Sequence, residues 1–63
     1  MYSVNENVNA LIKNGNNYKV DKSFNPKAHT QWAGYTVTIG GTKYLKVRYN
    51  NKDFYLPFGT YGA

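Results

Sequence analysis

Apolar and polar residues alternate along most of the C-terminal half of the chain. The segments WAGYTVTI, TKYLKVRY and DFYLPF each place every second side chain on one face, and Gly40-Gly41 and residues 50–52 separate them. A period of two over this length is typical of β-strands with one buried face. Residues 32–58 are therefore predicted to form a three-stranded antiparallel meander.

The first turn decides which side chains share a face, because a slip of one residue reverses every side chain of a strand. A strict two-residue loop at Gly40-Gly41 puts the apolar rows of the first two strands on opposite faces. A three-residue bulged loop that begins at Ile39 pairs Tyr35 with Leu45 and brings both rows to one face. It also places a glycine where such loops need a positive φ. The bulged loop is the preferred prediction.

The second turn agrees with the same buried face. A loop of two or four residues pairs Tyr49 with Phe54, and Asn50-Asn51 suits this loop because asparagine tolerates the left-handed conformation. Pro57 lacks a backbone N–H donor, so the third strand is expected at an edge of the sheet, at least near its end.

The opposite face combines flat aromatic rings with cations. In the predicted registers, Arg48 of the middle strand falls opposite Trp32 on one side and Tyr55 on the other. The candidate binding residues are Trp32, Tyr44, Lys46, Arg48 and Tyr55, extended by Lys43 and Lys52 at the turns. Single-stranded nucleic acid is bound by such a combination, since bases stack on aromatic rings and cations contact phosphates.

Three alternative roles compete for this face. Arg48 could simply stack on Trp32 and Tyr55 as a cross-strand cation–π cluster. The N-terminal segment could cover the face. Trp32 and Tyr44 could instead anchor a protein–protein interface, where aromatic residues are enriched.

The N-terminal segment has the pattern of a short helix. Residues 3–6 have the S-x-x-E spacing of a capping box, and Asn14-Gly15 supplies a helix stop. Apolar residues recur at helical spacing, at Val4, Val8, Leu11 and Ile12. A helix over residues 4–13 is predicted. The alternative is a strand in which Val8, Ala10 and Ile12 alternate with polar residues.

The remaining segments complete a single domain over residues 1–63. Residues 18–20 are predicted to form a short strand, 21–31 a loop pinned by Phe24, and 59–63 a fraying tail. The predicted fold class is α+β, with the short N-terminal helix packed on a twisted antiparallel sheet of three to four strands. The alternative is a small SH3-like β-barrel that begins with a strand.

The length of the chain limits its core, and its charge favours certain classes of partner. A chain of 63 residues buries only roughly 60% of its unfolded surface, and it has no cysteine to form a disulfide. Aromatic rings, or oligomerisation, would have to supply the missing stability. The net charge of +5 favours nucleic acid or an acidic protein surface as partner, although charge also serves solubility.

Catalysis, metal binding and membrane insertion find little support. His29 is the only histidine, no cysteine pairs with it, and the three carboxylates are scattered, so the protein is predicted to be neither an enzyme nor dependent on a metal or cofactor. No apolar stretch is long enough for a bilayer span or a signal-peptide core. With Met1 as the native start, the sequence predicts a cytoplasmic protein without membrane contact.

One stretch resembles a known family. The segment GTKYLKVRYNNKDFYL, about a quarter of the chain, is similar to the strand–turn–strand of Gram-positive cell-wall-binding repeats, and this resemblance implies cell-wall polymer binding as a third function. The first prediction is a small basic binding domain that contacts nucleic acid or a nucleoprotein through its aromatic and basic face. The alternative is a phage- or bacterium-encoded inhibitor or adaptor that docks on a protein.

Overall fold

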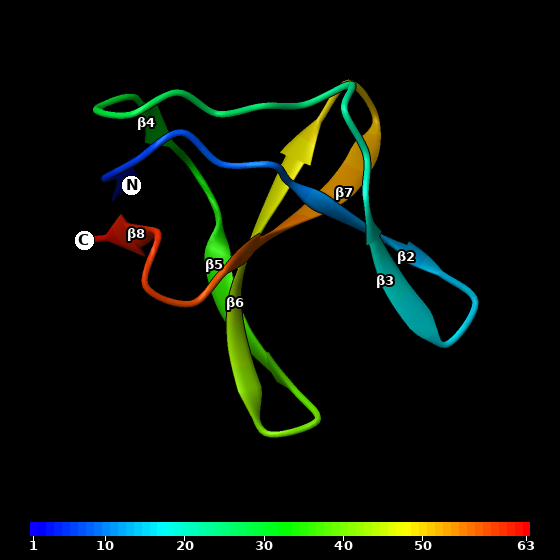
Figure 1. Ribbon diagram of the computed structural model, residues 1–63. Coiled ribbons are helices and arrows are strands. Elements are labelled where there is room, and N and C mark those ends of the chain that lie inside the picture. Colours follow the sequence, from blue (N-terminus) through cyan, green and yellow to red (C-terminus); the bar gives the residue numbers. More distant parts are fainter.

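Eight β-strands and no helix make up the chain, which the computed structural model describes over residues 1–63 (Figure 1). The larger of two antiparallel sheets has the order β3-β2-β7-β6-β5. Its strands are β2 (Leu11–Asn14), β3 (Asn17–Val20), β5 (Tyr35–Ile39), β6 (Thr42–Tyr49) and β7 (Lys52–Pro57). The smaller sheet has the order β4-β1-β8. Its strands are β1 (Tyr2–Val4), β4 (Gln31–Trp32) and β8 (Tyr61–Gly62).

The predicted helix over residues 4–13 is wrong, and with it the α+β class. β1 ends at Val4, β2 begins at Leu11, and the residues between them have no regular secondary structure. Val8 and Ala10 are buried, 5% and 0% exposed, and alternate with exposed polar residues. Over so few residues a period of two and a helical period select overlapping apolar positions. The SH3-like alternative is also all-β, but the chain forms two separate sheets.

Asparagine side chains attach this N-terminal segment to distant parts of the chain. Asn7 Oδ1 accepts a hydrogen bond from the Ala28 N–H at 2.9 Å, and Asn5 Nδ2 donates one to the Gly59 carbonyl at 3.2 Å. Asparagine favours such bonds over a helix interior because its side chain competes for backbone partners. These partners lie far away in sequence, so the local pattern could not reveal them.

Two-residue turns connect the strands of the larger sheet. They are Gly15-Asn16, Gly40-Gly41 and Asn50-Asn51. In the last two, both residues have a positive φ, as a type I′ turn requires. The bulged turn preferred from the sequence is wrong, because Ile39 pairs with Thr42 and Val37 with Tyr44. The apolar side chains of β5 therefore lie on the face opposite the core.

The second hairpin keeps the predicted core face. Val47 pairs with Phe54 and Leu45 with Leu56, two residues away from the pairing expected for a four-residue loop. A shift of two preserves the face of every side chain, and all four residues are buried at 1% exposure or less. Phe58, expected in the same apolar row, lies beyond β7 and is 70% exposed.

β7 lies inside the larger sheet, between β2 and β6, so it is not an edge strand as a whole, although the edge position predicted for its end is correct. Its pairing with β2 is limited to Leu11 and Tyr55. The end of β7 around Pro57 is therefore unpaired on that side, where a missing N–H donor is tolerated.

The loop over residues 21–30 closes the core from outside the sheets. Phe24 is 3% exposed and stacks on Tyr49, with ring centroids 4.3 Å apart. It also meets the edge of Trp32 at 4.9 Å and tilts against Phe54 at the same distance. The loop thus adds a large ring to a core formed mainly by β6, β7 and the N-terminal segment.

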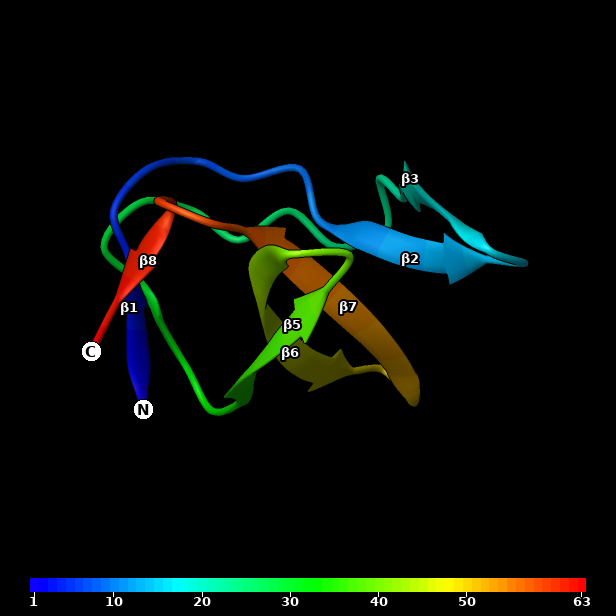
Figure 2. The same ribbon diagram turned by 90° about the horizontal axis from the view of Figure 1, so that it is seen from below.

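The smaller sheet holds both ends of the chain together. β1 is its central strand and pairs Val4 with Tyr61 of β8 and Tyr2 with Trp32 of β4. The tail expected to fray is therefore attached to the N-terminus, and Figures 1 and 2 show β1 and β8 side by side, away from the β2–β3 hairpin. None of the elements is a helix of the length and apolar character that a bilayer crossing needs.

Candidate functional site

Aromatic and charged side chains gather on one face of the larger sheet, here called the outer face. The β5–β6 register places Tyr35 beside Lys46, and the β6–β7 register places Lys46 beside Tyr55 and Arg48 beside Asp53. Lys46 and Arg48 alternate with the buried Leu45 and Val47 of β6, so their side chains point away from the core, and the registers put Tyr35, Asp53 and Tyr55 on the same face. The outer face is defined by these five residues together with Tyr44 of β6 and Tyr18 of β3, which packs on it.

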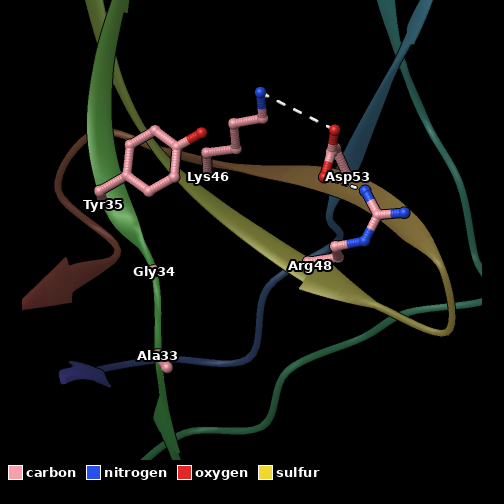
Figure 3. Close-up of a pocket in the computed structure, with 6 residues that line it drawn as sticks. All are labelled: Ala33, Gly34, Tyr35, Lys46, Arg48 and Asp53. Atoms are coloured by element: carbon pink, nitrogen blue, oxygen red, sulfur yellow. Dashed lines mark hydrogen bonds and ion pairs between the residues drawn. The ribbon is translucent and has the colours of Figure 1, made fainter.

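A shallow hollow of about 610 Å³ opens on the outer face. It lies where the link between β4 and β5 passes beside β6. Figure 3 shows the Tyr35 ring and the Lys46 side chain on one side of the hollow, and the Arg48 and Asp53 side chains facing each other. The hollow is lined by Ala33, Gly34, Tyr35, Lys46, Arg48 and Asp53.

Gly34 allows the link to lie directly against β6. A Cβ atom at this position would be 2.4 Å from the carbonyl oxygen of Lys46 and 3.2 Å from Cγ2 of Val47. Because the nearer atom belongs to the backbone, it cannot move aside as a flexible side chain would. A residue other than glycine would push the link outward and change the shape of the hollow.

Asp53 forms ion pairs with both cations of the outer face. Its Oδ1 is 3.1 Å from Arg48 Nη1 and its Oδ2 is 3.8 Å from Lys46 Nζ. The exposed fractions of these side chains are 65% for Arg48, 26% for Lys46 and 39% for Asp53. Water and salt screen such exposed pairs, so they contribute little to stability. Two cations and one carboxylate leave the hollow with a net positive charge.

Lys46 is held between two aromatic rings. Its Nζ atom lies 5.8 Å from the ring centroids of Tyr35 and Tyr55, within the range of a cation–π interaction. Electrostatic interactions with Tyr55, the Tyr35 hydroxyl and the Asp53 carboxylate raise the pKa of Lys46. Lys46 therefore stays a cation throughout the physiological pH range.

A second aromatic group on the outer face has a structural role. Tyr18 of β3 stacks on Tyr44, with centroids 5.9 Å apart and planes 15° apart, and meets Tyr55 edge-on at 5.1 Å. Tyr55 is only 7% exposed, so its ring offers no open surface for a ligand. Tyr35, in contrast, is 59% exposed and presents the free aromatic surface of the outer face.

Trp32 does not lie on the outer face. It belongs to β4 of the smaller sheet, packs edge-on against Phe24 at 4.9 Å, and donates a hydrogen bond from Nε1 to Thr30 Oγ1 at 2.8 Å. The segment WAGYTVTI was expected to be one strand, but it is interrupted after Trp32, because β4 pairs with β1 in the smaller sheet while β5 pairs with β6. Tyr35, not Trp32, is the exposed ring beside Lys46 on the outer face.

The other predicted site residues divide into two groups. Tyr44, Lys46, Arg48 and Tyr55 share the outer face, as the alternation predicted. Lys43 lies apart from them, in a small hollow that it lines with Gly41, Thr42 and Phe58. Tyr35 was missed because the bulged turn put it in the core. Two glycines that both accept a positive φ were the signal for the shorter turn.

Lys52 lines a second hollow where β2 and β7 diverge. This hollow measures about 350 Å³ and is lined by Ile12, Lys13, Lys52, Asp53 and Tyr55. Because Asp53 lines both hollows, they are neighbours on the surface. Together they place four cations around a single carboxylate.

Titratable groups outside this region do not converge. His29 is exposed on the 21–30 loop, and Asp21 Oδ1 accepts a hydrogen bond from the Ser23 N–H at 2.9 Å. Hydrogen bonding by Ser23 lowers the pKa of Asp21. No group of three or more histidine, aspartate or glutamate side chains is placed to hold a metal ion.

No family model matches the chain, and no curated protein or solved structure is significantly similar to it. The inference about function therefore depends on the geometry of the outer face.

Proposed function

We propose that the protein is a small non-enzymatic domain that binds single-stranded nucleic acid on its outer face. The observation that carries the proposal is the exposed Tyr35 ring in a hollow shared with Lys46 and Arg48. A base stacked on an aromatic side chain contributes about 1–3 kcal/mol, and neighbouring cations contact the phosphates. This arrangement supplies both kinds of contact within one hollow.

The shape of the site favours a single strand over a duplex. An exposed ring can stack only on a base whose face is free, as in an unpaired strand. The chain also has no helix, the element that most often enters the major groove of a duplex. Both features point to unstacked bases as the ligand.

Asp53 limits the strength of this interaction. A phosphate that approaches Arg48 or Lys46 has to compete with the carboxylate, which is already 3.1 Å and 3.8 Å from them. The expected affinity is therefore that of weak, sequence-independent binding, with a dissociation constant of about 1–100 µM at physiological salt.

The second hollow extends the contact surface along the strand. Lys13 and Lys52 line it on the other side of Asp53. With two to four phosphates contacted, the slope of log K against log salt concentration is expected to be about −1.4 to −2.8 for a single strand.

Fluorescence anisotropy of labelled oligonucleotides tests the proposal. An oligo-dT of about 20 nucleotides, long enough for a site of this size, is compared with a duplex of the same length over a salt series. We expect preference for the single strand and loss of affinity in Arg48→Ala. Lys22→Ala, which removes the same charge from the exposed 21–30 loop, is the control. Equal, weak binding to every polyanion and equal affinity of the two variants would contradict the proposal.

A protein partner is the second candidate. Phe58 is 70% exposed and lies beside Lys43 and the Gly40-Gly41 turn, and exposed aromatic side chains are enriched at protein interfaces. A complex recovered from a nuclease-treated lysate that is insensitive to salt would favour this function over nucleic-acid binding.

A further inference from the structure

β5 forms an open edge of the larger sheet that lacks the usual protection against pairing. The strand contains Tyr35–Ile39, with sequence YTVTI, and includes no charged residue and no proline. Its register with β6 is continuous, without a bulge. Natural edge strands usually carry one of these features, because an unpaired edge invites another strand. The other edge, β3, is shorter and carries Lys19.

The backbone groups of two threonines point outward from this edge. In a two-residue hairpin the pair that flanks the turn is hydrogen-bonded, and such pairs alternate along the strands. Ile39, Val37 and Tyr35 are therefore bonded to β6. Thr36 and Thr38 direct their N–H and C=O groups away from β6, and both residues are exposed.

We propose that β5 pairs with β5 of a second copy of the chain, antiparallel and about a two-fold axis at Val37. In this register, Thr36 of one copy lies opposite Thr38 of the other, and both outward-facing threonines form their backbone bonds. Tyr35 lies opposite Ile39, and Val37 lies opposite itself. Threonine pairs and aromatic pairs with β-branched residues are favourable across strands, so the strand is complementary to itself.

The charge distribution fits a second copy of the chain. An acidic peptide would need cations along this edge, and β5 has none. The cations that pair with residues of β5, Lys43 and Lys46, lie on the neighbouring strand β6. In the dimer the two β6 strands are three strand spacings apart, about 14 Å. This exceeds the screening length of about 8 Å at physiological ionic strength, so repulsion between the copies is largely screened there and opposes the dimer mainly at low salt.

The dimer would join the two larger sheets into one, with both outer faces on the same side. It would also support a small core that has no disulfide. Added salt weakens the repulsion between two chains of charge +5, which favours the dimer. Added salt also weakens phosphate contacts, which disfavours nucleic-acid binding. The two salt dependences are therefore opposite. The two proposals can therefore fail independently.

Sedimentation velocity of the protein without nucleic acid tests the dimer, at concentrations from about 10 µM to about 1 mM and at two salt concentrations. We expect a monomer–dimer equilibrium that shifts to dimer at higher salt. Val37→Lys and Val37→Glu each place like charges opposite each other at the axis, and each should raise the dissociation constant at least about tenfold. An equimolar mixture of the two should dimerise again.

Val20→Lys is the matched control, because it makes the same change at an exposed position of the other edge strand. It should dimerise as the unmodified protein does. A protein that is monomeric throughout the range, or a Val37→Lys variant that dimerises normally, would overturn the proposal.

A cysteine at the axis gives a second test that does not add charge. The chain has no other cysteine, and directly opposed residues of an antiparallel pair have Cα atoms about 4.5–5.5 Å apart, which suits a disulfide. Val37→Cys should become a covalent dimer under mild oxidation, with an unchanged circular dichroism spectrum. Val20→Cys should remain monomeric. Equal cross-linking of both variants would contradict pairing through β5.

Discussion

Arg48 on β6 lies directly opposite Asp53 on β7, and its Nη1 atom is 3.1 Å from the carboxylate Oδ1. The same guanidinium donates a hydrogen bond to the Asn51 carbonyl at 3.4 Å, which orients it toward the turn. The outer face thus contains its own anion, which neutralises part of the charge that a phosphate would contact. This relationship sets the expected affinity of the site and leads to the first prediction.

Replacing the carboxylate should strengthen nucleic-acid binding. Asp53→Asn removes the negative charge that competes for Arg48 and Lys46, so affinity for oligo-dT should rise about three- to tenfold at low salt. Stability should change by less than about 1 kcal/mol because the ion pairs are exposed. Anisotropy and urea unfolding measure the two effects. Unchanged or lower affinity would show that these cations do not contact phosphate.

The close approach of Gly34 to β6 should make this position intolerant of a side chain. Gly34→Ala introduces a Cβ atom 2.4 Å from the Lys46 carbonyl oxygen, and overpacking of this kind costs about 1–3 kcal/mol of unfolding free energy. Gly62→Ala is the control, since a Cβ atom there meets nothing within 4 Å. Urea unfolding compares them, and equal midpoints would contradict the packing described for the link.

Substitution of Trp32 should lower the stability of the fold, whereas substitution of Tyr35 should not. Trp32 packs on Phe24, so Trp32→Ala should lower the unfolding free energy by about 2–3 kcal/mol, less than for a fully buried ring. Tyr35→Leu should leave stability nearly unchanged because the ring is 59% exposed. Thermal unfolding followed by circular dichroism distinguishes them. A stable Trp32→Ala variant that has lost oligonucleotide binding would show that Trp32 belongs to the binding site.

Tyr61 should link stability to alkaline pH. Its hydroxyl is buried without a hydrogen-bond partner. Burial, and to a smaller extent the nearby Tyr2, raises the pKa of Tyr61 above the usual value of 10.0. Because the folded state holds this proton more tightly, the stabilisation is complete below about pH 10 and is lost as the pH rises through the folded pKa. Urea unfolding from pH 8 to pH 11 should show this loss.

Tyr61→Phe isolates that contribution from those of the other tyrosines and the lysines. It removes the buried, unpaired hydroxyl, so we expect a gain of about 1 kcal/mol at neutral pH and a shallower decline above pH 10. An equally steep decline in the variant would assign the alkaline loss to other groups.

The sequence predicted the central antiparallel sheet and its buried row because alternation in β6 and β7 is long and unambiguous. Leu45, Val47, Phe54 and Leu56 form the core as expected. The N-terminal helix failed because Val4, Val8 and Ile12 fit both a helical period and a period of two, and the bonds of Asn5 and Asn7 that favour an irregular chain are non-local. No local propensity contains that information.

The candidate site was recovered in part for a similar reason. Lys46, Arg48 and Tyr55 share one strand pair whose register differed from the prediction by an even number, so their face was right. On β5 the register differed from the prediction by one residue. Tyr35 therefore lies on the outer face, where the prediction had placed its neighbours Gly34 and Thr36. Trp32 lies off the outer face because it pairs with Tyr2 of β1 in the smaller sheet instead of with β6, and spacing alone does not predict such a long-range pairing.

The most direct test of the central claim is the affinity of Tyr35→Leu for a labelled oligo-dT. The account predicts binding by the unmodified protein with a dissociation constant of about 1–100 µM, normal binding by Tyr35→Phe, and a loss of at least about fivefold in Tyr35→Leu because the stacking ring is gone. All three proteins should give the same circular dichroism spectrum. Equal affinities for Tyr35→Leu and Tyr35→Phe, or no binding by the unmodified protein, would contradict the claim that the outer face is a nucleic-acid site.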